Sequence, residues 1–93
     1  MNKSDLIEAL SKDTGITINK AEDVVKTVFN SMTNALVAGD RVEIRGFCSM
    51  YVKHYKGYIG KNPKTSESVH VKAKMLPFFK CGKELKERVD TQQ

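Results

Sequence analysis

In the first 40 residues, apolar positions recur every three or four residues, which is the period of an α-helix. A first helix is predicted between a cap at Asn2 and the turn residue Gly15, and a second between Thr17 and Gly39, with Asn19 as a competing start. The stripe of the first helix is Leu6, Ile7 and Leu10, and that of the second is Ala21, Val24, Val25, Val28, Phe29, Met32, Ala35 and Leu36. Two amphipathic helices joined by a short turn predict a helical hairpin.

After Gly39 the pattern changes to alternation, which is the period of a β-strand. Residues 41–45 place Val42 and Ile44 on one face of a first strand, and Gly46 permits a tight reversal. The second strand then has Cys48, Met50 and Val52 on one face. The sheet of the predicted α+β fold therefore starts with an antiparallel pair.

Residues 75–80 predict a third strand, in which Pro77 cannot donate a ladder hydrogen bond. This strand is expected at the edge of the sheet or at a bulge. Leu85 and Val89 lie four positions apart in a last short helix, residues 82–90, and fraying is expected at residues 91–93.

Residues 53–74 join the second strand to the third and predict a β-ribbon arm. Strand-forming residues flank Asn62-Pro63-Lys64-Thr65, in which Asn and Pro suit the first two positions of a type I turn. Two strands of about nine residues make an arm on the order of 30 Å long. The competing interpretation is a solvated mobile loop, although the strand formers on both sides favour the ribbon.

The distribution of charge along the chain indicates a candidate binding surface. Residues 53–74 contain six lysines and one acid, so their charge of +5 equals the net charge of the whole chain. Residues 1–40 carry four lysines and six acids, and residues 41–93 carry twelve basic and five acidic residues. The basic part favours a polyanionic partner such as a nucleic acid.

Length and cysteine content indicate what kind of protein this is. Ninety-three residues allow one small domain, residues 1–93, made of a helical base (1–40), a sheet (41–52 and 75–80), the arm (53–74) and the last helix (82–90). Two cysteines without a signal peptide indicate a reducing compartment, and no apolar run is long enough to span a membrane.

Three runs, in this order, resemble the signature motifs of the bacterial HU and integration host factor family. They are Glu43-Ile44-Arg45-Gly46-Phe47, Gly60-Lys61-Asn62-Pro63-Lys64-Thr65, and Phe79-Lys80-x-Gly82-Lys83-Glu84-Leu85. The likeness covers essentially the whole chain. The sequences of the first two runs are nearer to the beta subunit of integration host factor, although HU homodimers share them.

The resemblance implies an intertwined dimer, of two identical chains or two related ones, whose two arms lie in the minor groove of double-stranded DNA and bend it with low sequence specificity. It implies a cytoplasmic, nucleoid-associated bacterial protein with no cofactor, membrane or small-molecule substrate. Phe47, Met50 and Phe79 are implied in the dimer core. The implied DNA contacts are Lys3, Arg45, Lys53, Tyr55, Lys56, Tyr58, Lys61, Asn62, Pro63, Lys64, Thr65, Lys72, Lys74, Lys80, Lys83 and Lys86.

The chain departs from the family pattern at several positions. The family usually has glycine at positions 48 and 66, phenylalanine at 50, arginine at 55 and 58, and proline at 81, where this chain has other residues. Ser66 matters for the turn, because a residue with positive φ there favours glycine. Tyr55 and Tyr58 remove charge, which predicts weaker or less salt-sensitive binding.

Other functions fit the residues less well. Cys48, His54, His70 and Cys81 lack the spacing of metal ligands, and the carboxylates lie among lysines, so neither a metal site nor an enzyme is expected. A sequence-preferring subunit of an integration-host-factor-type heterodimer, or a ribbon regulator that reads the major groove, remains an alternative. An RNA-binding or protein-binding module lacks the aromatic motifs of RNA-binding sheets.

Overall fold

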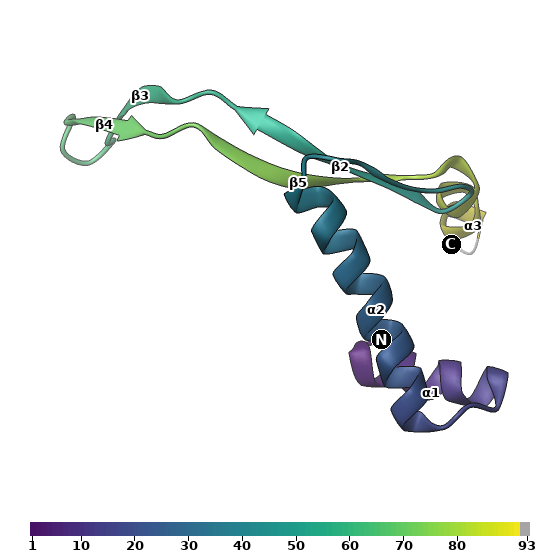
Figure 1. Ribbon diagram of the computed structural model, residues 1–93. Helices are drawn as coiled ribbons and strands as arrows, with labels where there is room; N and C mark the ends of the chain where they lie inside the picture. Colours follow the sequence, from purple (N-terminus) through teal and green to yellow (C-terminus); the bar gives the residue numbers. More distant parts are fainter. Residues whose placement is uncertain (92–93) are drawn as a thin grey trace.

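The computed structural model describes residues 1–91. Of residues 91–93, where fraying was expected, Thr91 belongs to the last helix, and Gln92 and Gln93 lie outside the described residues. Residues 1–91 form three helices and five strands (Figure 1). In chain order they are α1 (Lys3–Thr14), α2 (Ile18–Val37), β1 (Val42–Ile44), β2 (Cys48–Tyr55), β3 (Tyr58–Lys61), β4 (Ser68–Val71), β5 (Lys74–Cys81) and α3 (Lys83–Thr91). The predicted α+β fold is confirmed.

Local polar contacts define the ends of the first two helices, as the sequence predicted. Asn2 and Asp5 cap each other, because each side chain accepts a hydrogen bond from the other's backbone N–H, at 2.9 and 3.0 Å. Thr17, rather than Asn19, caps α2 by accepting from the backbone N–H of Lys20 at 3.2 Å. Gly15 and Gly39 end the helices with φ of 76° and 81°.

The helical hairpin buries only part of the predicted apolar stripe. Ile7 of α1 packs against Ala21 and Val25 of α2, with Leu6, Leu10 and Ile16 around them. Val24, Val28 and Phe29 belong to the same stripe but are 45, 49 and 47% exposed. The periodicity therefore identified the apolar face of α2 correctly, while α1 covers only one part of it.

The main sheet has the antiparallel order β1-β2-β5, and β3 and β4 form a separate two-stranded ribbon. The three predicted strands are thus confirmed. Pro77 of β5 pairs with Val52 of β2. Because β5 is an edge strand, the N–H that proline lacks costs no ladder hydrogen bond on the side of β5 that has no neighbouring strand.

The arm differs from the predicted pair of continuous nine-residue strands. Pairing stops after Tyr55 and Lys74 and resumes at Tyr58 and Val71, which leaves two unpaired residues in each of the two chain segments, 56–57 and 72–73. The strands approach closely there, since a Cβ on Gly57 would lie 2.8 Å from the backbone oxygen of Val71. The register is the same on both sides of the gap, so the interruption adds no residue to either strand.

The tip of the arm is also longer than the predicted turn over residues 62–65. Asn62 and Pro63 take the first two positions as expected, but the loop closes at Ser66, whose N–H donates to the Asn62 carbonyl at 2.7 Å. Ser66 has a φ of 60°, the left-handed conformation for which the family pattern has glycine. Asn62 and Glu67 complete the closure through a backbone hydrogen bond of 2.9 Å.

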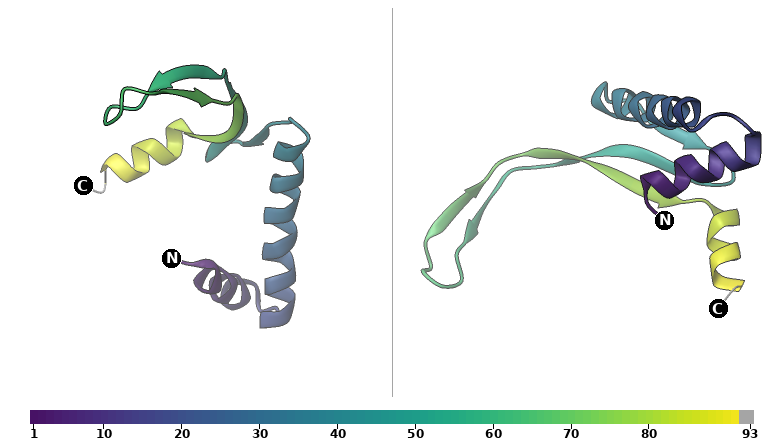
Figure 2. Two further views of the ribbon diagram at one scale, coloured as in Figure 1. Left: turned by 90° about the vertical axis from the view of Figure 1, so that its left-hand side faces the viewer. Right: turned by 90° about the horizontal axis from the view of Figure 1, so that it is seen from below.

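The whole chain is extended (Figures 1 and 2). The sheet and α3 lie at one end of α2, and α1 lies at the other end. The arm projects from the sheet, away from all three helices. The radius of gyration is 19.2 Å, against about 12 Å for a compact domain of this length. The accessible surface is 8157 Å², against about 5,400 Å² for a compact monomer of 10.5 kDa. One chain therefore leaves an unusually large surface uncovered.

A close backbone contact joins α3 to the hairpin of β1 and β2. The N–H of Gly82 donates to the carbonyl of Phe47 at 2.7 Å, and a Cβ on Gly82 would lie 2.8 Å from that oxygen. Gly46, with a φ of 83°, turns the chain just before Phe47. Only glycine fits at residue 82 without displacing backbone.

We expect Gly82→Ala to destabilise the protein by about 1–3 kcal/mol, the usual cost of adding a methyl group to a packed site. Thermal unfolding followed by circular dichroism at one fixed protein concentration measures the change. Gly60→Ala is the matched control, because its Cβ would meet only the ring of Tyr58, at 3.4 Å. A Gly82→Ala protein as stable as the control would contradict the importance of this close approach.

Candidate nucleic-acid interface

The strand register sorts the side chains of the sheet and the arm into two faces. Neighbouring side chains in a strand point to opposite faces, so each paired position assigns two residues to one face. The face that we call the basic face consists of Ser49, Tyr51, Lys53, Tyr55, Ile59, Lys61, Ser68, His70, Lys74, Leu76, Phe78 and Lys80. The opposite face, here the apolar face, consists of Cys48, Met50, Val52, His54, Tyr58, Gly60, Val69, Val71, Met75, Pro77, Phe79 and Cys81.

The four lysines of the strands all lie on the basic face. Lys53 and Lys61 come from the outgoing strands, and Lys74 and Lys80 from β5. The arm has three further lysines. Lys56 and Lys72 lie in the unpaired gap between the β2–β5 and β3–β4 pairs, and Lys64 lies at the tip.

The apolar face points toward the helices. A groove lined by the last turn of α2 and by this face contains Leu36, Val37, Met50, Val52 and Pro77. The basic face therefore points away from α2, which lies below β2 and β5 in Figure 1. This arrangement leaves the lysines free to meet a large anionic surface.

Aromatic rings support the lysines at the base of the arm. The ammonium of Lys53 lies 3.7 Å from the centre of the Phe78 ring, and Tyr51 packs against the same ring with centres 5.3 Å apart. Lys74 lies 5.9 Å from the Tyr55 ring. The sequence analysis did not select Tyr51 or Phe78, although the alternation with Lys53 and Tyr55 places Tyr51 on the same face.

At the tip, the Asn62 side chain stabilises the turn, as expected for Asn at the first turn position. Its side-chain oxygen accepts from the backbone N–H of Lys64 at 3.0 Å. Thr65 accepts from the N–H of Glu67 at 3.4 Å. Pro63 is exposed at the end of the arm, so its ring is accessible to a ligand.

Three other predicted contact residues, Arg45, Lys83 and Lys86, form a second group near α3, next to Lys80 of the basic face. Arg45 lies in the turn before β2 and lines a shallow pocket together with Gly82. Lys80, Lys83 and Lys86 are exposed just before and within α3. Lys3 is separate from both groups, at the start of α1 and the far end of α2 from the sheet (Figure 1).

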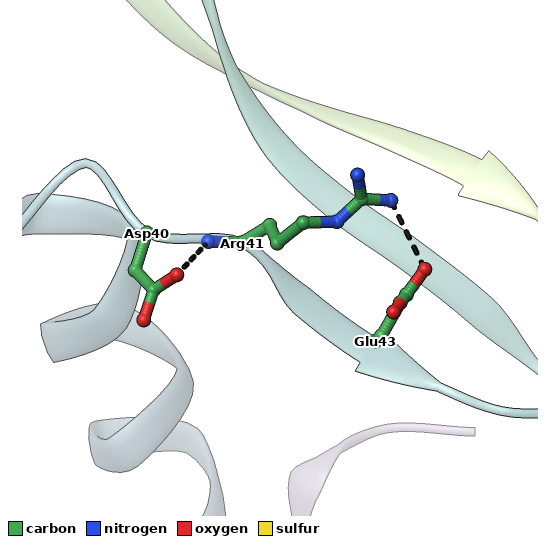
Figure 3. A network of polar contacts seen from close by, with 3 residues as sticks. All are labelled: Asp40, Arg41 and Glu43. Carbon is green, nitrogen blue, oxygen red and sulfur yellow. Dashed lines mark hydrogen bonds and ion pairs between the residues drawn. The ribbon is translucent and has the colours of Figure 1, made fainter.

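Arg41, which was not predicted as a contact residue, is held at the junction of α2 and β1 (Figure 3). Its guanidinium donates to Glu43 at 3.1 Å, and its backbone N–H donates to Asp40 at 2.8 Å. Both charged side chains are exposed, so the pair adds little to stability, but it turns Arg41 toward its own strand.

Among the strand residues selected as DNA or dimer contacts, three lie on the apolar face. Tyr58 faces the apolar side, unlike Tyr55. Met50 and Phe79 face each other across β2 and β5 on the apolar face. Phe79 is 52% exposed in the chain, and Phe47, in the preceding turn, is 48% exposed. The chain itself thus leaves the residues expected in a dimer core uncovered.

Within residues 1–91, no cluster of three or more His, Cys, Asp or Glu side chains could hold a metal ion. No helix in the same range is long and apolar enough to cross a membrane.

Residues 1–90 match the model of a family described as bacterial DNA-binding proteins. Integration host factor subunit beta of Haemophilus influenzae is 46% identical over 93 residues, and the match covers 99% of each chain. The same subunit of Actinobacillus succinogenes is 48% identical over 91 residues, which cover 97% of each chain. The predicted likeness to the beta subunit is confirmed.

Two solved structures have the same fold. The chain in an Anabaena HU–DNA cocrystal structure matches with a TM-score of 0.85 and 32% identity, over 96% of this chain and 97% of that one. HU from Thermotoga maritima matches with a TM-score of 0.68 and 30% identity, over 96% and 98%. The chain belongs to the bacterial DNA-binding protein family that includes HU and integration host factor.

Proposed function

We propose that the protein bends double-stranded DNA as an architectural dimer, with one arm from each chain lying in the minor groove. The observation that carries the proposal is the position of all four strand lysines on the face that points away from the helices. Phosphate neutralisation by such a face is independent of sequence, and bending brings more of the protein body against DNA. Low sequence specificity follows.

The dimer is proposed from the uncovered apolar surface. Phe47, Met50 and Phe79 are assigned to the interface between the chains, together with the exposed part of the α2 stripe. A second copy is the simplest partner, and a related chain would serve the same purpose. Residues 1–93 then act as one unit, in which residues 1–40, 41–52, 75–80 and 82–90 form the body and residues 53–74 form the arm.

The contact residues divide by role in this proposal. The arm lysines and Tyr55 follow the DNA backbone, and Asn62, Pro63 and Thr65 enter the minor groove at the tip. Arg45, Lys80, Lys83 and Lys86 contact the bent duplex on the body. Lys3 and Tyr58 contribute only where the partner chain or the twist of the arm brings them to DNA.

The second candidate is a sequence-preferring subunit of a heterodimer. It is supported by the name of the relatives at 46–48% identity, which are integration host factor beta subunits. Competition of bent, nicked and linear duplexes against RNA, with the protein alone and with a related alpha-type subunit, distinguishes the candidates. A tenfold or larger preference for one random duplex over another favours the sequence-preferring subunit. We place the protein at the nucleoid in the bacterial cytoplasm, where chromosomal DNA is its ligand.

Salt dependence tests the basic face. Each lysine–phosphate pair releases counterions, so the logarithm of the binding constant falls with the logarithm of salt concentration by about 0.9 per phosphate. We expect replacing Lys61, Lys74 and Lys80 with Ala to flatten this slope by about one unit for each phosphate that is no longer neutralised. Lys12→Ala, on the exposed end of α1, is the control and leaves the slope unchanged. Equal slopes for both proteins would mean that the basic face does not follow the phosphates.

Pro63→Ala tests the role of the tip. If Pro63 inserts between base steps, the mutant folds normally but the bend angle at saturating protein falls sharply, because unstacking contributes to the kink. End-to-end fluorescence transfer on a short labelled duplex measures the angle. Pro77→Ala controls for removal of a proline away from the tip and bends DNA like the parent protein. If Pro63→Ala bends DNA as the parent protein does, Pro63 only shapes the turn and does not insert between base steps.

A further inference from the structure

The two cysteines of the chain are direct partners in the sheet, although 32 residues separate them in the sequence. Cys48 is the first residue of β2 and Cys81 the last of β5, and the register places them opposite each other. Both are free thiols on the apolar face, where Cys48 is 5% exposed and Cys81 is exposed. The DNA-binding proposal uses neither of them.

The hydrogen-bond pattern shows which kind of pair they form. The neighbouring pair, Phe47 and Gly82, shares a backbone hydrogen bond of 2.7 Å. Paired positions alternate in an antiparallel ladder, so Cys48 and Cys81 occupy a position without shared hydrogen bonds, where Cα atoms lie about 4.5 Å apart. Disulfides span Cα separations of about 4.4–6.8 Å, so the two strands need no rearrangement to be joined.

We propose that Cys48 and Cys81 are a modification site at which a peroxide-class oxidant forms a reversible cross-strand disulfide. The exposed Cys81 reacts first: its sulfur attacks one peroxide oxygen, the O–O bond breaks, and a sulfenic acid and one water form. Cys48 sulfur then attacks the Cys81 sulfur, the S–O bond breaks, and the hydroxide leaves with the Cys48 proton as a second water. Two electrons pass from the two sulfurs to the peroxide.

The local geometry permits the second step. The Cys81 thiol now donates to the carbonyl of Gly82 at 3.4 Å, so a rotation about its Cα–Cβ bond is needed to turn it toward Cys48. The Cα separation lies at the short end of the disulfide range, and deviations from the preferred geometry make a disulfide easier to reduce. The bond closes a loop that contains the entire arm, while the basic face stays unmodified.

The test uses the full, reduced chain and hydrogen peroxide. After oxidation, the protein is denatured, free thiols are alkylated, and the intact mass is measured without reductant. We expect a single chain that is two hydrogens lighter and carries no alkyl group, with a linked peptide pair containing Cys48 and Cys81 after digestion. A dithiol restores two alkylatable thiols.

Single-cysteine variants identify the order of reaction. Cys48→Ser retains the exposed thiol and is expected to give a sulfenic acid that dimedone traps, whereas Cys81→Ser retains the buried thiol and stays alkylatable. The proposal is overturned if the parent chain keeps two alkylatable thiols under conditions that oxidise Cys48→Ser. It is also overturned if the disulfide joins two chains, which doubles the mass on the same measurement.

Discussion

The apolar surface that one chain leaves uncovered is the constraint on which the rest of the structure depends. Only Ile7, Ala21, Val25 and Cys48 form the buried apolar set in residues 1–91. Burial of apolar area is the main favourable term in folding, so a core of this size cannot hold an extended chain of this shape. The exposed stripe of α2 and the side chains of Phe47, Met50 and Phe79 therefore require a second chain. The basic face, on the opposite side of the sheet, stays uncovered by that contact.

The register of β2 with β5 transmits this constraint to the DNA-binding surface. A slip of β5 by one residue against β2 would move Lys74 and Lys80 to the face opposite Lys53. The register continues unchanged across the gap at Gly57, so the arm extends the surface that the sheet begins. A single pairing thus places Met50 and Phe79 on the side of the partner chain and the strand lysines on the side of DNA.

Much of the fold was predictable because its signals are local. Helix caps at Asn2 and Thr17 and the apolar periods of α1 and α2 follow from neighbouring residues. The gap at Gly57 was not predictable, since it depends on how closely the backbone of Val71 approaches. For the candidate site, charge identified the arm lysines, and strand alternation was enough to separate Tyr55 from Tyr58. Only the register brought the two cysteines together.

The most direct test of this account is the association state of the intact protein without DNA. Sedimentation over a range of protein concentrations is expected to give twice the chain mass of 10.5 kDa, with an unfolding temperature that rises with concentration. Such a result follows if folding and association are one process. A folded, thermally stable monomer at micromolar concentration would contradict the account, because the apolar surface of the sheet and α2 would then need no partner.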